Sequence, residues 1–101
     1  MNNSKRIKVY IVDSNNDYRY VCADNLRKMG IDVVGESADG CEALSAISRY
    51  RPDVVLTDLW IPGLDISCLM SEALKLDESY RPEFLLVTGI NNRNLNFYYI
   101  F

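Results

Sequence analysis

Short apolar runs alternate along the chain with longer segments in which apolar residues recur every three or four positions. The runs are rich in β-branched residues and predict buried strands over residues 7–12, 31–34, 54–57 and 84–87. The longer segments predict helices over residues 17–30, 42–50 and 69–74. Gly30 is the expected C-terminal glycine of the first helix, and Pro52 ends the second. Residues 96–101 form a candidate fifth strand.

Strands that alternate with helices in this way imply βαβ units with right-handed crossovers. We therefore expect an α/β fold in one domain over residues 1–101, built on a doubly wound parallel sheet with helices on both faces. The expected strand order is 2-1-3-4-5, in which the first, third and fourth strands are neighbours.

Composition and charge narrow the functional classes. Hydrophobic residues make up 49% of the chain and charged residues 25%, which is typical of a globular domain. The formal net charge of -3 gives no electrostatic reason to bind nucleic acid or an anionic membrane. Residues 1–8 lack the apolar run of a signal peptide, and no apolar stretch approaches the length of a membrane span. We expect a cytoplasmic protein that contacts neither nucleic acid nor membrane.

Nucleophilic and metal-binding residue types are few. Cys22, Cys41 and Cys68 are widely spaced, so we expect them to be buried or half-buried thiols of a reducing cytosol. The chain has no histidine, which excludes an imidazole base or ligand from this chain. It also lacks a phosphate-cradling G-x-x-x-x-G-K loop, which disfavours an independent hydrolase. Lysines and arginines are assigned to a solvated face.

Polar side chains follow three of the predicted strands. Asp13 ends the first strand, Asp58 the third and Thr88 the fourth. Ligands of open parallel sheets bind beyond the carboxyl ends of the strands, where the strand order reverses. The reversal falls between the first and third strands, so two carboxylates and a hydroxyl are expected to converge at one rim. The alternatives are a helix-capping or turn role for each aspartate and an ordinary strand-end threonine.

Two neighbouring carboxylates repel each other, and a divalent cation that prefers oxygen ligands, such as Mg²⁺, relieves the repulsion. A carboxylate beside Mg²⁺ can attack a phosphoryl group, because the metal offsets the charge on both reactants. A threonine hydroxyl across the gap can donate a hydrogen bond to a phosphoryl oxygen. The rim therefore predicts Mg²⁺-dependent phosphoryl chemistry.

Four segments resemble the receiver domain of two-component response regulators, the CheY-like family: IKVYIVDSN, DVVGESADGCEAL, RPDVVLTDLWIPGLD and FLLVTG. The resemblance covers roughly residues 5–89, and residues 90–101 are an atypical tail. It implies a flavodoxin-like fold, Mg²⁺ as cofactor, and a histidine kinase or histidine phosphotransfer protein as partner in a phosphorelay. The roles it implies are Asp58 as phosphoacceptor and metal ligand, Asp13 as the first acid of the metal pocket, the backbone carbonyl of Trp60 as a further metal ligand, Thr88 as the switch hydroxyl, and Pro62 with Gly63 as the turn after the acceptor.

Three residues depart from the family pattern near this site. Ser14 stands where the family has a second acid, so it is a weak metal ligand and Mg²⁺ affinity should fall. Ile66 stands where the family has a glycine, and because a β-branched residue resists positive φ we expect the turn there to be rebuilt. Trp60 is large beside a site that needs water for dephosphorylation, so it either shields an acyl phosphate or blocks its formation.

The C-terminal region departs further. The family has a lysine after its fifth strand, whereas the last lysine here is Lys75. The span from Thr88 to Asn96 is too short for a loop and a normal fourth helix. We expect a C-terminally truncated receiver that is incomplete after strand 4, with helix 4 shortened or missing and helix 5 missing. The uncovered C-terminal face predicts self-association into a homo-oligomer, or instability.

Two functions are open at this point. The first is a two-component receiver that accepts a phosphoryl group on Asp58 with Mg²⁺ bound. It would not be an enzyme beyond self-phosphorylation from a donor and autodephosphorylation. The alternative is a degenerate receiver that acts as a phosphorylation-independent interaction module, which Ser14, Ile66 and the absent lysine favour.

Overall fold

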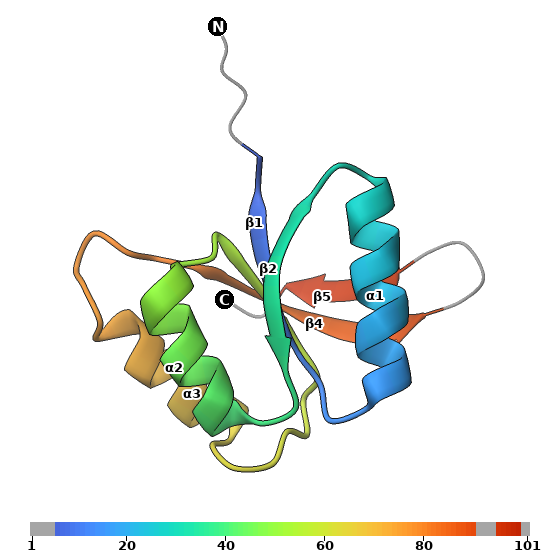
Figure 1. Ribbon diagram of the computed structural model, residues 1–101. Helices are drawn as coiled ribbons and strands as arrows, with labels where there is room; N and C mark the ends of the chain where they lie inside the picture. The colour runs from blue at the N-terminus through green and yellow to red at the C-terminus, as the bar shows by residue number, and fades with distance from the viewer. Residues whose placement is uncertain (1–5, 91–94, 100–101) are drawn as a thin grey trace, which may run out of the picture.

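The computed structural model describes residues 6–90 and 95–99, and the side chains of residues 6–87. Strands and helices alternate as far as the third helix, and two strands follow (Figure 1). In chain order the elements are β1 (Lys8–Val12), α1 (Asn16–Lys28), β2 (Asp32–Ser37), α2 (Gly40–Tyr50), β3 (Val54–Thr57), α3 (Ile66–Leu74), β4 (Glu83–Ile90) and β5 (Leu95–Tyr99).

The sheet has five strands in the order β2-β1-β3-β4-β5. Strands β1 to β4 are parallel, which confirms the predicted doubly wound sheet through its fourth strand. The expected parallel continuation is wrong for the fifth strand, because β5 pairs with β4 antiparallel. Strand β5 covers Leu95–Tyr99, and the last two residues of the predicted strand over residues 96–101 lie outside the described residues. A parallel strand pair needs a crossover of about a dozen residues. The short connection from Ile90 to Leu95 permits only the antiparallel pairing.

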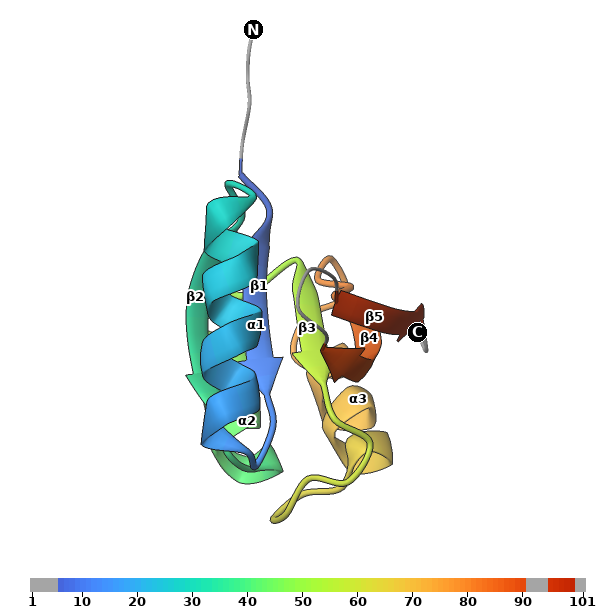
Figure 2. The ribbon, with the colours of Figure 1, turned by 90° about the vertical axis from the view of Figure 1, so that its right-hand side faces the viewer.

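Helix α1 covers one face of the parallel strands, and α2 and α3 cover the other (Figures 1 and 2). Successive residues of a strand point to opposite faces. Accordingly, Val9 and Ile11 of β1 pack in the cluster under α1, whereas Tyr10 and Val12 pack in the cluster under α2 and α3. Within the described ranges β5 lies along β4, and no helix makes comparable contact with it.

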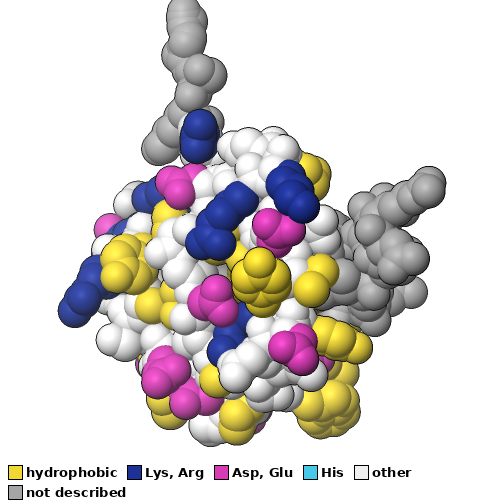
Figure 3. All heavy atoms as spheres, turned by 45° about the vertical axis from the view of Figure 1, so that its right-hand side comes forward, with side chains coloured by type: hydrophobic (Ala, Val, Ile, Leu, Met, Phe, Trp, Pro, Cys, Tyr) yellow, Lys and Arg dark blue, Asp and Glu magenta, His cyan; other side chains and the backbone are white. Residues whose placement is uncertain are grey.

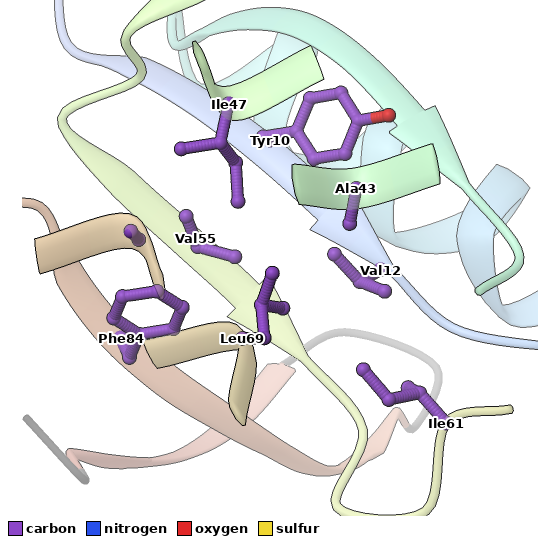
Figure 4. Close-up of a cluster of buried hydrophobic side chains, with 9 residues drawn as sticks. Tyr10, Val12, Ala43, Ile47, Val55, Ile61, Leu69 and Phe84 are labelled. Carbon is purple, nitrogen blue, oxygen red and sulfur yellow. The ribbon is translucent and has the colours of Figure 1, made fainter. Parts of the chain in front are cut away.

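The cluster under α2 and α3 is the larger of the two cores (Figure 4). It includes Ile61, which belongs to the loop between β3 and α3 and is 8% exposed. That loop is therefore held against the sheet by a core side chain. The other buried members are Tyr10, Val12, Ala43, Ile47, Val55, Leu69, Ala73 and Phe84.

Helix and strand ends follow local rules, and several differ from the predicted bounds. The side chains of Asn15, Asp39 and Asp65 each cap a helix by accepting a hydrogen bond from the backbone N–H three residues later. Gly30 has φ +83 directly after α1, which confirms its predicted role. Strands β2 and β4 run further than predicted, to Ser37 and Ile90. Backbone pairing continues there through polar residues, which the apolar pattern does not reveal.

The surface carries acidic, basic and apolar side chains. Figure 3 shows acidic and basic side chains interspersed on one face, with apolar side chains between them. Cys22 is buried, but Cys41 and Cys68 are exposed, so the expectation of buried or half-buried thiols was wrong for these two. The inner faces of their helices are occupied by Ala43 and Leu69 and their neighbours instead. Of the helices in the described ranges, none has the length and apolar character needed to cross a membrane.

Candidate functional site

Asp13 and Asp58 lie side by side at the carboxyl ends of the two central strands. The register pairs Val12 of β1 with Thr57 of β3, so each aspartate is the first residue beyond its strand. The backbone N–H of Asp58 donates to the carbonyl of Val12 at 3.0 Å, and that of Asp13 donates to the carbonyl of Ser37 at 3.1 Å. This is the point where the strand order reverses, and the structure brings the two predicted acids together there. We call Asp13, Asp58 and the loops that follow them the acid rim.

The carboxyl group of Asp13 is in an unfavourable environment for its charge. Its residue is only 8% exposed, and burial is the main cause that raises its pKa above the ordinary value. The charge of Asp58 raises that pKa further, while a hydrogen bond from the backbone N–H of Asn15 at 2.9 Å and the charge of Arg19 lower it. A cation at the rim would relieve both the burial cost and the repulsion.

The oxygen atoms that the acid rim offers are of the type that Mg²⁺ binds. Mg²⁺ is commonly held by one or two carboxylates and keeps several of its waters. Asp13 and Asp58 supply two carboxylates, and the loop after Asp58 supplies backbone carbonyls such as that of Trp60. Ser14 is exposed and offers a hydroxyl in place of a third acid. Across the described residues, no group of three or more acids and thiols lies close enough to hold a metal ion by itself.

The loop from Asp58 to Asp65 is anchored on the start of α2. The backbone N–H of Gly40 donates to the carbonyl of Pro62 at 2.9 Å. A Cβ added to Gly40 would lie 2.0 Å from the carbonyl oxygen of Leu64, so only glycine permits this approach. Gly63 adopts φ +84, a backbone conformation that favours glycine. It lies in the predicted Pro62–Gly63 turn.

Trp60 and Leu59 extend from this loop into solvent. The side chain of Trp60 is 80% exposed, and Leu59 is also exposed. Asp58, in contrast, is half-buried, and its backbone carbonyl accepts a hydrogen bond from the buried hydroxyl of Thr57 at 2.8 Å. The indole of Trp60 therefore does not bury the acceptor residue.

Ile66 fits the turn without positive φ, as expected if the turn is rebuilt. It is the first residue of α3, directly after the cap residue Asp65. Arg51 is the only described non-glycine residue with positive φ, so Ile66 has no such conformation. The positive φ of the loop falls on Gly63.

Thr88 is placed differently from the prediction. It lies inside β4, which continues to Ile90, rather than at the end of the strand. Its side chain falls outside the described part of the structure, as do the side chains of Tyr98 and Tyr99. The convergence of its hydroxyl with the two acids stays a prediction.

Arg19 of α1 contacts the acid rim, so the expectation that arginines lie on a solvated face is wrong for this residue. Its side chain is 13% exposed and forms an ion pair with Glu36 at 2.8 Å. It also donates to the backbone carbonyl of Asp13 and to the side-chain oxygen of Asn16. The available sequence signal was its position, less than two helical turns after Asp13, but Glu36 comes from the end of another strand.

The family model of the response regulator receiver domain matches residues 9–95 of this chain. The chain belongs to this family. Sporulation initiation phosphotransferase F of Bacillus subtilis is similar, with 32% identity over 82 residues that cover 81% of this chain and 65% of that protein. A protein-glutamate methylesterase/protein-glutamine glutaminase of Haloarcula marismortui is 41% identical over 59 residues, which are 58% of this chain and 16% of that protein.

A solved receiver domain supports the same assignment. It belongs to the sensor histidine kinase PA1611 of Pseudomonas aeruginosa and has a magnesium ion coordinated in its active site cleft. The TM-score is 0.73 at 26% identity, over 83% of this chain and 68% of that one. This receiver chain spans less than two thirds of the length of either curated relative.

Proposed function

We propose that this receiver domain accepts a phosphoryl group on Asp58 from a phosphohistidine of a partner protein. The observation that carries the proposal is the juxtaposition of Asp58 and Asp13 at the ends of neighbouring parallel strands. The partner is a histidine kinase or a histidine phosphotransfer protein, because this chain contains no histidine of its own. The similarity to a sporulation phosphotransferase supports phosphoryl transfer as the chemistry.

The transfer is a single displacement at phosphorus. An oxygen of the Asp58 carboxylate forms the new bond, the bond to the partner's imidazole nitrogen breaks, and the electron pair returns to that nitrogen. Asp58 is half-buried, so the donor can approach from the solvent side. The backbone hydrogen bond from Asp58 to Val12 and the contact from Thr57 fix the main chain of the nucleophile during this approach.

Mg²⁺ would be held by Asp13, Asp58 and the backbone carbonyl of Trp60, with Ser14 as a weak additional ligand. When bound, the cation offsets the negative charge of the acids and the incoming phosphoryl group. Thr88 is the proposed switch hydroxyl that follows the phosphoryl group, and the added charge of about -1.5 to -2 is the signal it reads. Trp60, with most of its side chain in solvent, would screen the acyl phosphate from only one side.

Treatment with acetyl phosphate or beryllofluoride tests the proposal. Trp60 is the single tryptophan and lies two residues after Asp58, so its fluorescence reports on the site. We expect a Mg²⁺-dependent change in the wild type and none in Asp58→Asn. The absence of any response at millimolar Mg²⁺ would count against phosphoacceptor function.

The second candidate is a degenerate receiver that binds a partner without phosphorylation. The exposed Ser14 in place of a metal-binding acid and the antiparallel β5 favour it. Mg²⁺ titration distinguishes the two functions, since an interaction module needs no metal response of Trp60. A saturable response that Asp13→Asn abolishes would count against the degenerate alternative, and phosphorylation of Asp58 would exclude it.

Self-association through the C-terminal face is a further part of this proposal. Strand β5 is the last strand of the sheet, and an edge strand presents unpaired backbone groups to a second copy. Light scattering after size-exclusion chromatography should detect a dimer or larger species. A clean, stable monomer would contradict this part without affecting the phosphoacceptor proposal.

A further inference from the structure

The guanidinium group of Arg19 joins three segments around the acid rim. Its Nε donates to Glu36 at 2.8 Å, its Nη1 donates to the backbone carbonyl of Asp13, and its Nη2 donates to the side chain of Asn16. The side chain is 13% exposed, so these contacts are largely shielded from water. A planar guanidinium can serve several acceptors in fixed directions, which the point charge of a lysine cannot.

These contacts complete the fixation of Asp13. The backbone N–H of Asp13 is held by the carbonyl of Ser37 at 3.1 Å, and its side-chain Oδ1 accepts from the backbone N–H of Asn15 at 2.9 Å. The remaining backbone group of Asp13 is the carbonyl, and Arg19 is its partner. Through Glu36, this carbonyl is tied to the end of β2 as well as to α1.

The rim has a particular need for such fixation. Asp13 carries a buried carboxylate next to Asp58, and Ser14 contributes no second acid that would share a cation. Displacement of Asp13 therefore removes one of two carboxylates, a larger share of the metal-binding groups than in a rim where a second acid follows Asp13. Groups that orient a metal ligand from behind commonly change metal affinity by about 10- to 100-fold when they are removed.

We propose that Arg19 is a positioning residue, which holds the Asp13 peptide between β2 and α1 so that the Asp13 carboxylate faces Asp58. The metal-affinity part of this inference rests on the proposed phosphoacceptor function. The positioning part rests only on the hydrogen bonds of Arg19 and is testable without any metal.

Amide hydrogen exchange without Mg²⁺ tests the positioning directly. In Arg19→Ala the Asn15 amide, which donates to Asp13, should exchange about tenfold faster because the loop opens locally. Amides of β3 should be unchanged. The matched control is Lys28→Ala, which removes an exposed cation of α1 that pairs with Asp24 at 3.0 Å, far from the rim. Equal exchange of the Asn15 amide in Arg19→Ala and the wild type would overturn the proposal.

Mg²⁺ titration of Trp60 fluorescence then measures the consequence. Arg19→Ala should raise the half-saturating Mg²⁺ concentration about tenfold or more, and Lys28→Ala should leave it unchanged. Arg19→Lys should behave like Arg19→Ala, because the donors of an ammonium lie on one nitrogen and cannot reach the three acceptors that Nε, Nη1 and Nη2 of Arg19 reach separately. Full recovery in Arg19→Lys would show that charge alone matters and would overturn a positioning role.

The two arms separate this inference from the proposed function. If the wild type shows no Mg²⁺ response but the Asn15 amide exchanges faster in Arg19→Ala, the phosphoacceptor function fails and the positioning role stands. If the wild type responds to Mg²⁺ and a folded Arg19→Ala keeps the same half-saturation, the metal-affinity part of the inference fails without affecting the proposed phosphoacceptor function.

Discussion

The acid rim and the β4–β5 hairpin belong to one sheet but differ in how they are held. The rim is fixed by contacts among β1, β2, β3, α1 and α2, with Asp13 and Asp58 on neighbouring parallel strands. The hairpin pairs β5 antiparallel to β4, and in the described ranges β5 packs chiefly on β4 alone. The contacts that hold the two acids, among the residues whose side chains the structure describes, come from β1, β2, β3 and α1. The comparison teaches that the placement of the two acids depends on the parallel strands and on α1, whereas the proposed switch residue Thr88 belongs to the hairpin.

The largest expected effect comes from Gly40→Ala. The new Cβ would lie 2.0 Å from the carbonyl oxygen of Leu64, so the loop after Asp58 must move. We expect a loss of about 3 kcal/mol in the free energy of unfolding, measured by chemical denaturation. Gly30→Ala is the control, because a Cβ there meets no atom within 4 Å and only the positive φ costs about 1 kcal/mol. Equal losses in the two variants would show that the loop is not anchored on α2.

Alkaline pH should lower the stability of the domain through ionisation of Cys22, which is buried in the core under α1. Burial, with smaller contributions from Asp13 and Glu36, raises the pKa of Cys22 from 9.0 to about 11. Since the folded pKa exceeds the unfolded one, the contribution of this thiol to stability is full below pH 9 and is lost as pH rises to about 11. The loss approaches about 3 kcal/mol, at roughly 1.4 kcal/mol per pH unit. Thermal unfolding of Cys22→Ala between pH 9 and 11 should show a shallower decline than the wild type; parallel curves would refute this.

Proline substitutions in β5 test the separation of rim and hairpin. Backbone N–H groups of successive strand residues point to opposite sides, so of Asn96→Pro and Phe97→Pro only one removes a hydrogen bond to β4. That variant should lose about 1 to 2 kcal/mol of stability, and the other should lose less. Both should keep the Mg²⁺ half-saturation of the wild type within about twofold. A large loss of Mg²⁺ response in a folded variant would mean that the rim depends on the hairpin.

The smallest effect is an increase in stability for Asp13→Asn. Burial and the charge of Asp58 raise the pKa of Asp13, so its ionised form at neutral pH opposes folding. Asparagine keeps an oxygen for the Asn15 N–H, and we expect a gain of about 1 kcal/mol without Mg²⁺. Asp17→Asn is the opposite control, because Asp17 lies in the first turn of α1 and its charge favours the helix by a few tenths of a kcal/mol. A loss of stability in Asp13→Asn would refute the claim that the ionised carboxylate of Asp13 opposes folding.

The sequence predicted the parallel sheet and the meeting of the two acids because both depend on buried strands. Residues 7–12 and 54–57 are almost continuously apolar, and the strand ends follow from the polar residue after each run. The direction of β5 was not predictable in the same way, since an apolar run has the same pattern in either direction. The short connection to Leu95 decided it.

Other features of the site depend on contacts that the sequence alone does not show. The sequence alone predicts a surface position for Arg19. In the structure Arg19 forms an ion pair with Glu36 at the end of β2. The sequence predicts a rebuilt turn at Ile66, but only the structure shows that Ile66 begins α3 and that Gly63 carries the positive φ. At both positions the prediction used the residue type alone. The structure adds a neighbouring residue, Glu36 for Arg19 and Gly63 for Ile66, that determines how the residue is accommodated. The role of Thr88 depends on a hydroxyl whose position lies beyond the described side chains.

Intact-mass spectrometry after incubation with acetyl phosphate and Mg²⁺ tests the central claim most directly. A receiver with a working acid rim should gain one phosphoryl group that maps to Asp58, and the adduct should disappear in Asp58→Asn and diminish strongly in Asp13→Asn. A wild-type chain that stays unmodified at saturating Mg²⁺, or an adduct that persists in Asp58→Asn, would contradict the account.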